Sequence, residues 1–198
     1  MNDVWKVRVD KITYGLIYPA FIGNMVYDLL LRKLAWSDSA LVYPNLWTCI
    51  AIVIFLIIDY MHLHGDMNEI VKTPERKTWR YILCDITTSM LIFFSFVFIK
   101  EDNLEIGVIL FTIIPFMILL YKWKNKNSRI YFVVYSLVGT VAACLLQLKF
   151  RASSGYSFYI FLYAIGSAFF YMVYISFFYV LKCKDFDIQY MTKRNAKY

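Results

Sequence analysis

The chain has 198 residues, of which 61% are hydrophobic, 20% are aromatic and only 18% are charged, with a formal net charge of +7. A soluble domain holds about 45–50% apolar and about 25% charged residues, and a water-soluble fold of this length could not bury the apolar surface that this chain carries. The basic residues gather at the ends of apolar segments, where they orient membrane proteins, so we exclude nucleic-acid binding. The composition predicts an integral membrane protein in contact with the lipid bilayer.

A helix needs about 20 mostly apolar residues to cross the hydrocarbon core of a bilayer. Six segments meet or approach this length, and short polar stretches separate them. We therefore predict an all-α integral membrane protein, a compact polytopic bundle of about six transmembrane helices that forms one domain over residues 1–198, with no soluble domain. The predicted spans are 12–31, 46–63, 79–99, 104–121, 130–148 and 158–181.

Two of these spans have features of their own. The first holds Asn24 and Asp28 within a long apolar run, and no small-residue cleavage site follows it directly. We therefore expect it to remain in the mature protein rather than to act as a signal peptide. The fourth span is short, begins beside Glu105 and contains Pro115, whose missing amide hydrogen predicts a kink.

The distribution of basic residues predicts the orientation. With six spans, both termini and the loops near 64–78 and 122–129 lie on one side of the membrane. That side carries sixteen of the 21 lysine and arginine residues, and the other side carries five. Because basic loops stay inside the cell, we predict that both termini are cytoplasmic and that the protein is a multi-pass protein of the inner (cytoplasmic) membrane.

Small residues on the last two spans predict where helices approach closely. Lipid provides no hydrophobic force between helices, so small side chains mark their contacts. Ser136, Thr140 and Cys144 follow each other at four-residue spacing on the fifth span, and Ala164 and Ala168 do so on the sixth. We expect these two helices to pack on each other or across a subunit interface, and we predict a homo-oligomer.

Ionisable residues inside the membrane are costly and usually have a function, so we treat them as candidate site residues. On the second span Asp59, His62 and Asp66 are separated by three and four residues, which places them on one face of a helix. Asp85 lies near the start of the third span, at a similar depth on the predicted cytoplasmic side. The two spans form a hairpin, so Asp59 and Asp85 can face each other.

Three interpretations of Asp59, His62, Asp66 and Asp85 remain open. In the first, they bind a divalent cation through one nitrogen and several carboxylate oxygens. In the second, they relay protons or line a cation path. In the third, which we take as the default, they are structural, and Asp85 pairs with Arg80 or with a neighbouring helix. The chain has no repeated Glu-x-x-His pattern of the kind that holds metals in helix bundles, so we predict no metal and no cofactor.

A second polar layer lies on the predicted outer side. Asn24, Asp28 and Arg32 follow each other at four-residue steps on the first span. Asp28 and Arg32 can form an ion pair across one helical turn, and Gln147 lies near the end of the fifth span on the same side. This layer is either a set of interfacial helix-end contacts or the lining of an outer pocket.

No sequence motif for catalysis is present. The chain lacks the phosphate-binding and dinucleotide-binding glycine patterns, the G-x-S-x-G element and the H-E-x-x-H pair. We therefore predict a non-enzymatic, oligomeric membrane-embedded subunit that senses membrane state or conducts ions and works with a cytoplasmic partner. A cytoplasmic protein partner would dock on its basic loops and tail. The alternatives are a stand-alone small transporter or ion channel and a metal-dependent intramembrane enzyme.

One compositional feature suggests a biological setting. The chain is rich in lysine, asparagine, isoleucine, phenylalanine and tyrosine, which have AT-rich codons. Such composition is frequent in laterally acquired bacterial genes, including those for small membrane subunits of anti-phage defence systems. This association rests on amino-acid composition and not on any particular residue, so it predicts a biological setting but no mechanism.

Overall fold

The computed structural model describes the backbone of residues 9, 11–34, 45–70, 79–122 and 126–195, and the side chains of residues 9, 11–31, 45–62, 82–120 and 129–177. Within these ranges the regular structure is entirely helical, which confirms the predicted fold class. Each of the two short π-helical segments is continuous with a longer α-helix, η1 before α2 and η3 after α6. The elements therefore form six continuous helical rods. In chain order they are η1 (Thr13–Ile17) with α2 (Tyr18–Leu34), α3 (Leu46–Ile70), α4 (Trp79–Lys100), α5 (Leu104–Lys122), α6 (Lys126–Leu145) with η3 (Leu146–Phe150), and α7 (Tyr156–Asn195).

The helices are long and apolar enough for a multi-pass membrane protein. Among the described residues, four segments can cross a membrane by length and composition: Thr13–Leu31, Ile82–Lys100, Arg129–Phe150 and Tyr156–Phe177. Two shorter apolar segments, Leu46–His62 and Leu104–Leu120, occupy the other two predicted spans. The chain is therefore a helical membrane protein with about six membrane helices.

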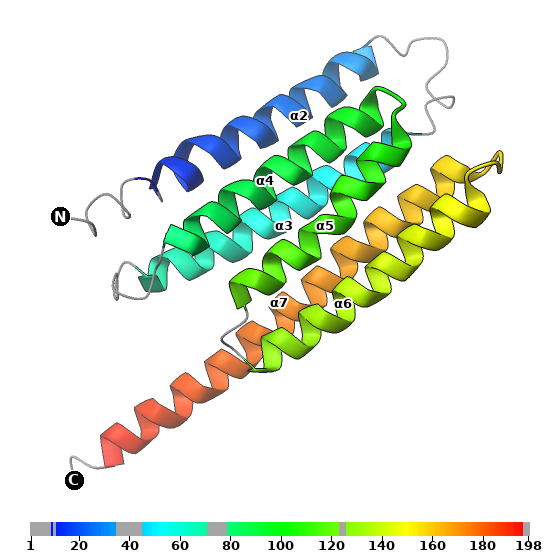
Figure 1. Ribbon diagram of the computed structural model, residues 1–198. Helices are drawn as coiled ribbons and strands as arrows, with labels where there is room; N and C mark the ends of the chain where they lie inside the picture. Colours follow the sequence, from blue (N-terminus) through cyan, green and yellow to red (C-terminus); the bar gives the residue numbers. More distant parts are fainter. Residues whose placement is uncertain (1–8, 10, 35–44, 71–78, 123–125, 196–198) are drawn as a thin grey trace.

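The helices form a bundle in which α3 is central (Figure 1). Helix α2 lies at one edge and packs on α3 and α4, while α7 packs along α3 and closes the bundle against α6. Helices α4 and α5 form a tightly packed hairpin, and α5 also packs on α6. The start of the α2 rod and the end of α7 lie at the same end of the bundle, as an even number of crossings requires.

Helix α7 continues well beyond its predicted span. Its 40 residues correspond to about 60 Å of helix, roughly twice the thickness of the hydrocarbon core. Figure 1 shows its last part extending past the ends of the other helices. The predicted end near residue 181 marks where the apolar sequence stops, and the helix itself runs on to Asn195.

The core is formed by aromatic and aliphatic side chains that meet around α3. Phe55 of α3 is fully buried, meets Phe111 of α5 edge to face and stacks on Tyr171 of α7. Outward-facing side chains, such as Val134 and Leu137 on α6, are apolar and exposed on the surface of the bundle. This arrangement suits a protein whose surface is covered by lipid, where exposed apolar side chains carry no cost.

Two glycines lie at contacts between helices, and one of these contacts, at Gly107, has no room for a side chain. A Cβ atom on Gly107 of α5 would overlap the side chain of Ile99 and lie 3.2 Å from the carbonyl oxygen of Ser95, both on α4. Gly139 of α6 is buried, and a Cβ atom there would lie 3.6 Å from the hydroxyl of Tyr163 on α7. The predicted contact between the last two spans is therefore made within the chain.

The first rod begins with a π-helical turn. Pro19 has no amide hydrogen and cannot donate to the carbonyl four residues earlier. In the turn before Pro19 the backbone hydrogen bonds reach back five residues instead of four, and the amide of Tyr18 donates to the carbonyl of Thr13. Such turns occur frequently at functional sites, and this one presents Tyr14 and Tyr18 to the interior.

Candidate functional site

A cluster of hydrogen-bonded polar side chains is buried between four helical rods, toward the end of the bundle where the α2 rod begins. Each member is at most 4% exposed. The members come from η1 and α2, α3, α4 and α7. We call this cluster the tyrosine–carboxylate network, and it consists of Tyr14, Tyr18, Asp59, His62, Asp85 and Tyr171.

Asp59 is the centre of the network. The hydroxyl of Tyr18 donates to its Oδ2 atom at 2.8 Å, and the hydroxyl of Tyr171 donates to its Oδ1 atom at 2.6 Å. Tyr18 belongs to α2 and Tyr171 to α7, so this one carboxylate connects helices on either side of α3. Hydrogen bonds to an ionised acceptor are roughly twice as strong as neutral ones, and here both carboxylate oxygens accept one.

His62 extends the network beyond Tyr171. Its Nδ1 atom lies 2.8 Å from the hydroxyl oxygen of Tyr171. A phenol has a single hydrogen, so when Tyr171 donates to Asp59, the Nδ1–H of His62 donates to Tyr171. The same atomic positions also allow the two hydrogen bonds to run in the opposite direction. In that arrangement the proton is on Asp59, the Tyr171 hydroxyl donates to Nδ1 of His62, and the hydrogen of the His62 ring is on Nε2. In the first arrangement His62 is an imidazolium with hydrogens on both ring nitrogens, and in the second it is neutral. A proton can thus pass between His62 and Asp59 through Tyr171 while the heavy atoms remain where they are.

Asp85 joins the network through the two tyrosines of the first rod. The hydroxyl of Tyr14 donates to its Oδ2 atom, and the Tyr18 hydroxyl lies 3.4 Å from its backbone oxygen. The rings of Tyr14 and Tyr18 stack with their centroids 5.7 Å apart. The prediction that Asp59 and Asp85 lie at a similar depth agrees with this geometry, because Tyr18 reaches both residues.

Aromatic rings surround the network on the side of α7. The ring of His62 meets Tyr171 and Tyr174 edge to face, with centroids 5.6 and 5.9 Å apart. Phe132 of α6 packs against Tyr174 at 4.7 Å. These rings cover the polar atoms of the network. Because the apolar surroundings have a low dielectric constant, the hydrogen bonds within the network are stronger than they would be in water.

The sequence did not identify the tyrosines as partners of the acids. No aromatic residue is among the candidate site residues predicted from the sequence, but the Tyr171 hydroxyl binds both Asp59 and His62. The available signal was the four-residue spacing of Tyr14 and Tyr18 on the first span, which predicts one shared helical face. The predicted partner of Asp85, Arg80, has its side chain outside the described residues.

The metal interpretation depends on a residue that the structure does not describe. Among the described side chains, no three histidine, cysteine, aspartate or glutamate residues come together in a way that could hold a metal ion. Asp59 and His62 belong to the tyrosine–carboxylate network, but the side chain of Asp66 lies outside the described residues. A site with Asp66 as its third ligand stays a prediction.

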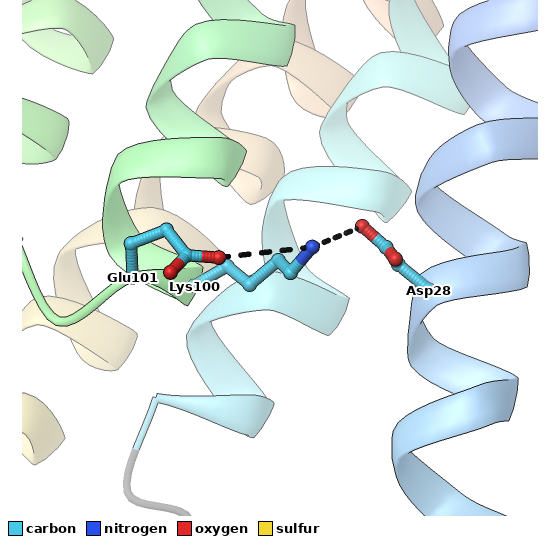
Figure 2. A network of polar contacts seen from close by, with 3 residues as sticks. All are labelled: Asp28, Lys100 and Glu101. Carbon is cyan, nitrogen blue, oxygen red and sulfur yellow. Dashed lines mark hydrogen bonds and ion pairs between the residues drawn. The ribbon is translucent and has the colours of Figure 1, made fainter.

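At the opposite end of the bundle, ion pairs connect neighbouring helices. Figure 2 shows Lys100 of α4 reaching toward Asp28 of α2, with its Nζ atom 2.6 Å from Asp28 Oδ2 and 3.8 Å from Glu101 Oε1. Asp28 thus has a described partner on another helix. The side chain of Arg32, its predicted partner, is outside the described residues.

Further contacts at this end attach α5 to η3. Arg151 Nη2 lies 2.5 Å from Glu105 Oε1, and the amide of Gln147 donates to the backbone oxygen of Glu105 at 3.4 Å. These groups are partly exposed, and exposed ion pairs contribute about 0–1 kcal/mol each. Together with Asp28, Lys100 and Glu101 they form what we call the charged rim, and its geometry supports the interpretation as helix-end contacts.

Asn24 differs from the other residues of the predicted outer layer. It lies on the exposed face of α2, near the middle of the Thr13–Leu31 segment. Within the described part of the chain it makes no hydrogen bond, so it does not belong to the charged rim.

Comparison with known proteins gives one weak similarity. No protein-family model matches the chain, and no solved structure matches it. Over 142 residues the chain is 26% identical to NADH-ubiquinone oxidoreductase chain 4 of Microtus pennsylvanicus. The match covers 69% of this chain and 66% of that protein, just under two thirds of its length. An identity this low does not assign the chain to a family, and what is shown is a membrane-embedded helical protein.

Proposed function

We propose that this chain is a non-enzymatic, membrane-embedded sensor subunit in which the tyrosine–carboxylate network holds a proton and couples its position to the packing of α2 and α7 on α3. The observation that carries the proposal is the double contact of Asp59, which accepts hydrogen bonds from Tyr18 of α2 and Tyr171 of α7. A change in the charge of Asp59 acts on both contacts at once. Ionisable groups inside a membrane are rare and usually functional.

The position of the network favours sensing over conduction. It occupies one end of the bundle, whereas the charged rim occupies the other. On α4, Asp85 and Lys100 are fifteen positions apart, which corresponds to about 22 Å of helix. A cluster confined to one depth can change its protonation from one side of the membrane. A conducting path must continue across the whole membrane.

Ion conduction is the second candidate, and hydroxyl groups near α7 favour it. Between the network and the charged rim, the Tyr135 hydroxyl donates to the backbone oxygen of Ser167 at 3.0 Å. Further along α7, the hydroxyls of Tyr163 and Thr112 lie 2.8 Å apart. On α7 these contacts occur at Tyr163 and Ser167, which lie at four-residue spacing with Tyr171 on one side of the helix, and they give a proton or a small cation polar contacts at intermediate depths.

The sensing proposal predicts a pH-dependent distance between α3 and α7. Spin labels at Met61 and Met172 report it, since both side chains are exposed and neither belongs to the network. Cys144 and Cys183 are first changed to alanine so that only the labels react. The distance distribution in lipid should shift with pH, because charge on Asp59 changes its bond to Tyr171. The shift should vanish in Asp59→Asn and persist in Asp28→Asn, a control in the charged rim.

Two results would count against the proposal. A distance that is the same at every pH would show that the network does not control helix packing. A pH-dependent shift that persists in Asp59→Asn would assign the effect to another group. In the same preparation, pH-driven proton flux into liposomes that is lost in Asp59→Asn would favour conduction instead.

The remaining elements of the predicted function rest on the sequence alone. A cytoplasmic partner at the basic loops and tail, a location in the inner membrane and a role in anti-phage defence stay predictions. The extension of α7 beyond its membrane segment, from Phe177 to Asn195, supports the first of these, since it offers helical backbone outside the bilayer for a partner to contact.

A further inference from the structure

Helix α2 has an outward face that the described part of the chain leaves uncovered. Only 17% of its membrane segment is buried within the bundle, against 50% for α4 and 33% for α7. It packs on α3 and α4 with the side that carries Tyr14, Tyr18 and Met25. The opposite side carries exposed residues at helical spacing, and we call it the Asn24 face: Leu16, Ala20, Gly23, Asn24, Tyr27 and Leu31.

No contact among the described residues explains the glycine at position 23. Its backbone has an ordinary helical conformation, since no glycine among the described residues has a positive φ. A Cβ atom at this position would meet nothing within 4 Å. A glycine in a helix interior lowers helix stability relative to alanine, so its presence on a membrane helix is expected where another helix approaches closely.

Asn24 indicates the chemistry of that other helix. Its amide is exposed near the middle of the membrane segment and makes no hydrogen bond to the described residues. An amide that faces lipid without a partner is costly. Asn24 lies about 16 Å along the helix from Thr13 and about 10 Å from Leu31, so a neighbouring helix in the membrane is the partner best placed to satisfy the amide.

We propose that the Asn24 face is the interface of a homodimer, in which α2 packs against α2 of a second copy. Two copies inserted with the same topology are related by a two-fold axis along the membrane normal, so equivalent residues lie at the same depth, and residues beside the axis meet their own equivalents. In the proposed dimer the axis passes beside Asn24, so the two Asn24 side chains meet. A primary amide is both donor and acceptor, so two amides related by this axis satisfy each other, and Gly23 lets the two backbones come close.

This surface lies on the other side of α2 from the tyrosine–carboxylate network, so the inference does not depend on the proposed function. It also locates the predicted homo-oligomer on the first span rather than on the last two. Gly139 on the fifth span is buried and already faces Tyr163 of the same chain.

The test measures dimerisation of the full chain in liposomes as a function of the protein-to-lipid ratio, by single-molecule subunit counting. Asn24→Leu removes the amide and should raise the dissociation constant roughly 3- to 30-fold. Gly23→Leu should weaken the dimer at least as much, because it separates the backbones. Two matched controls should leave it unchanged: Gly166→Leu on α7, where a Cβ atom also has open space, and Thr87→Leu, an exposed polar residue on α4.

Each result of the dimerisation measurement either supports or overturns the proposed interface. A wild-type dimer that is weakened by both α2 substitutions and by neither control supports it. A wild-type chain that is monomeric at every ratio overturns it and leaves the face to a different membrane protein. A dimer that survives both α2 substitutions, or one that Gly166→Leu disrupts instead, overturns it as well, because the interface then lies elsewhere.

Discussion

Replacing Asp59 with leucine is expected to lower the free energy of unfolding by about 2–6 kcal/mol, since two buried hydroxyls lose their acceptor at about 1–3 kcal/mol each. These are the hydroxyls of Tyr18 and Tyr171, which bind the two oxygens of the carboxylate. Replacement with asparagine is expected to cost less than about 1 kcal/mol, the scale of one ordinary hydrogen bond. Thermal unfolding in detergent, followed by circular dichroism, compares the two variants directly.

Asparagine is tolerated because the network can reverse the order of its donors. The amide oxygen of the new residue accepts from Tyr18, and its NH₂ group donates to the hydroxyl oxygen of Tyr171. Tyr171 then donates to Nδ1 of His62, which lies 2.8 Å away. Asp59→Asn thus keeps the fold and fixes one proton arrangement. Equal destabilisation by leucine and asparagine would show that the hydrogen bonds of Asp59 do not matter for stability.

Tyr171→Phe should have the second largest effect. It removes the one hydroxyl that contacts both Asp59 Oδ1 and His62 Nδ1, and the loss is expected to be about 2–4 kcal/mol because two buried groups lose a partner. Tyr159→Phe on the same helix is the matched control, because no hydrogen bond of its hydroxyl occurs among the described residues. Its expected effect is below about 0.5 kcal/mol.

A double-mutant cycle separates coupling from simple loss of packing. When Tyr171→Phe is combined with Asp59→Asn, the two effects should differ from additivity by about 0.5–3 kcal/mol, because the residues share one network. Additive effects would mean that Asp59 and Tyr171 stabilise the bundle independently. The same cycle with Tyr159→Phe should be additive.

The helices could be predicted from the sequence because the bilayer sets a simple requirement. Each span needs about 20 apolar residues, and basic residues collect on one side. The helix from Trp79 to Lys100 begins at the predicted residue for this reason. The extension of α7 to Asn195 could not be predicted in this way, since hydropathy reports the passage through lipid and not the end of the helix.

The candidate site could be predicted only in part. Asp59, His62 and Asp85 were identified because charged groups inside a membrane are conspicuous. Their partners depend on how far each helix is rotated and on which helices are neighbours, and a single sequence contains neither quantity. Tyr171 lies 112 positions from Asp59 and contacts it only because α7 packs along α3.

The charged rim shows the same limit. Local spacing predicts a pair between Asp28 and Arg32, which stays a prediction because the side chain of Arg32 is outside the described residues. It did not indicate the described partner of Asp28, which is Lys100, 72 positions away. The spacing of residues along one helix predicts contacts within that helix only. It contains no information on a lysine that the packing of another helix brings close. Asn24 was grouped with Asp28 by the same four-residue spacing, but it lies on the exposed face of α2.

The central claim is that Asp59 gains and loses a proton inside the folded bundle, and infrared difference spectroscopy in lipid tests it most directly. Spectra recorded between acidic and alkaline conditions should show the carbonyl band of a protonated carboxyl group that appears on acidification. That band should be absent in Asp59→Asn and present in Asp28→Asn. A difference spectrum in which Asp59→Asn retains every carboxyl band of the wild type would contradict the claim, because Asp59 would then keep one protonation state throughout.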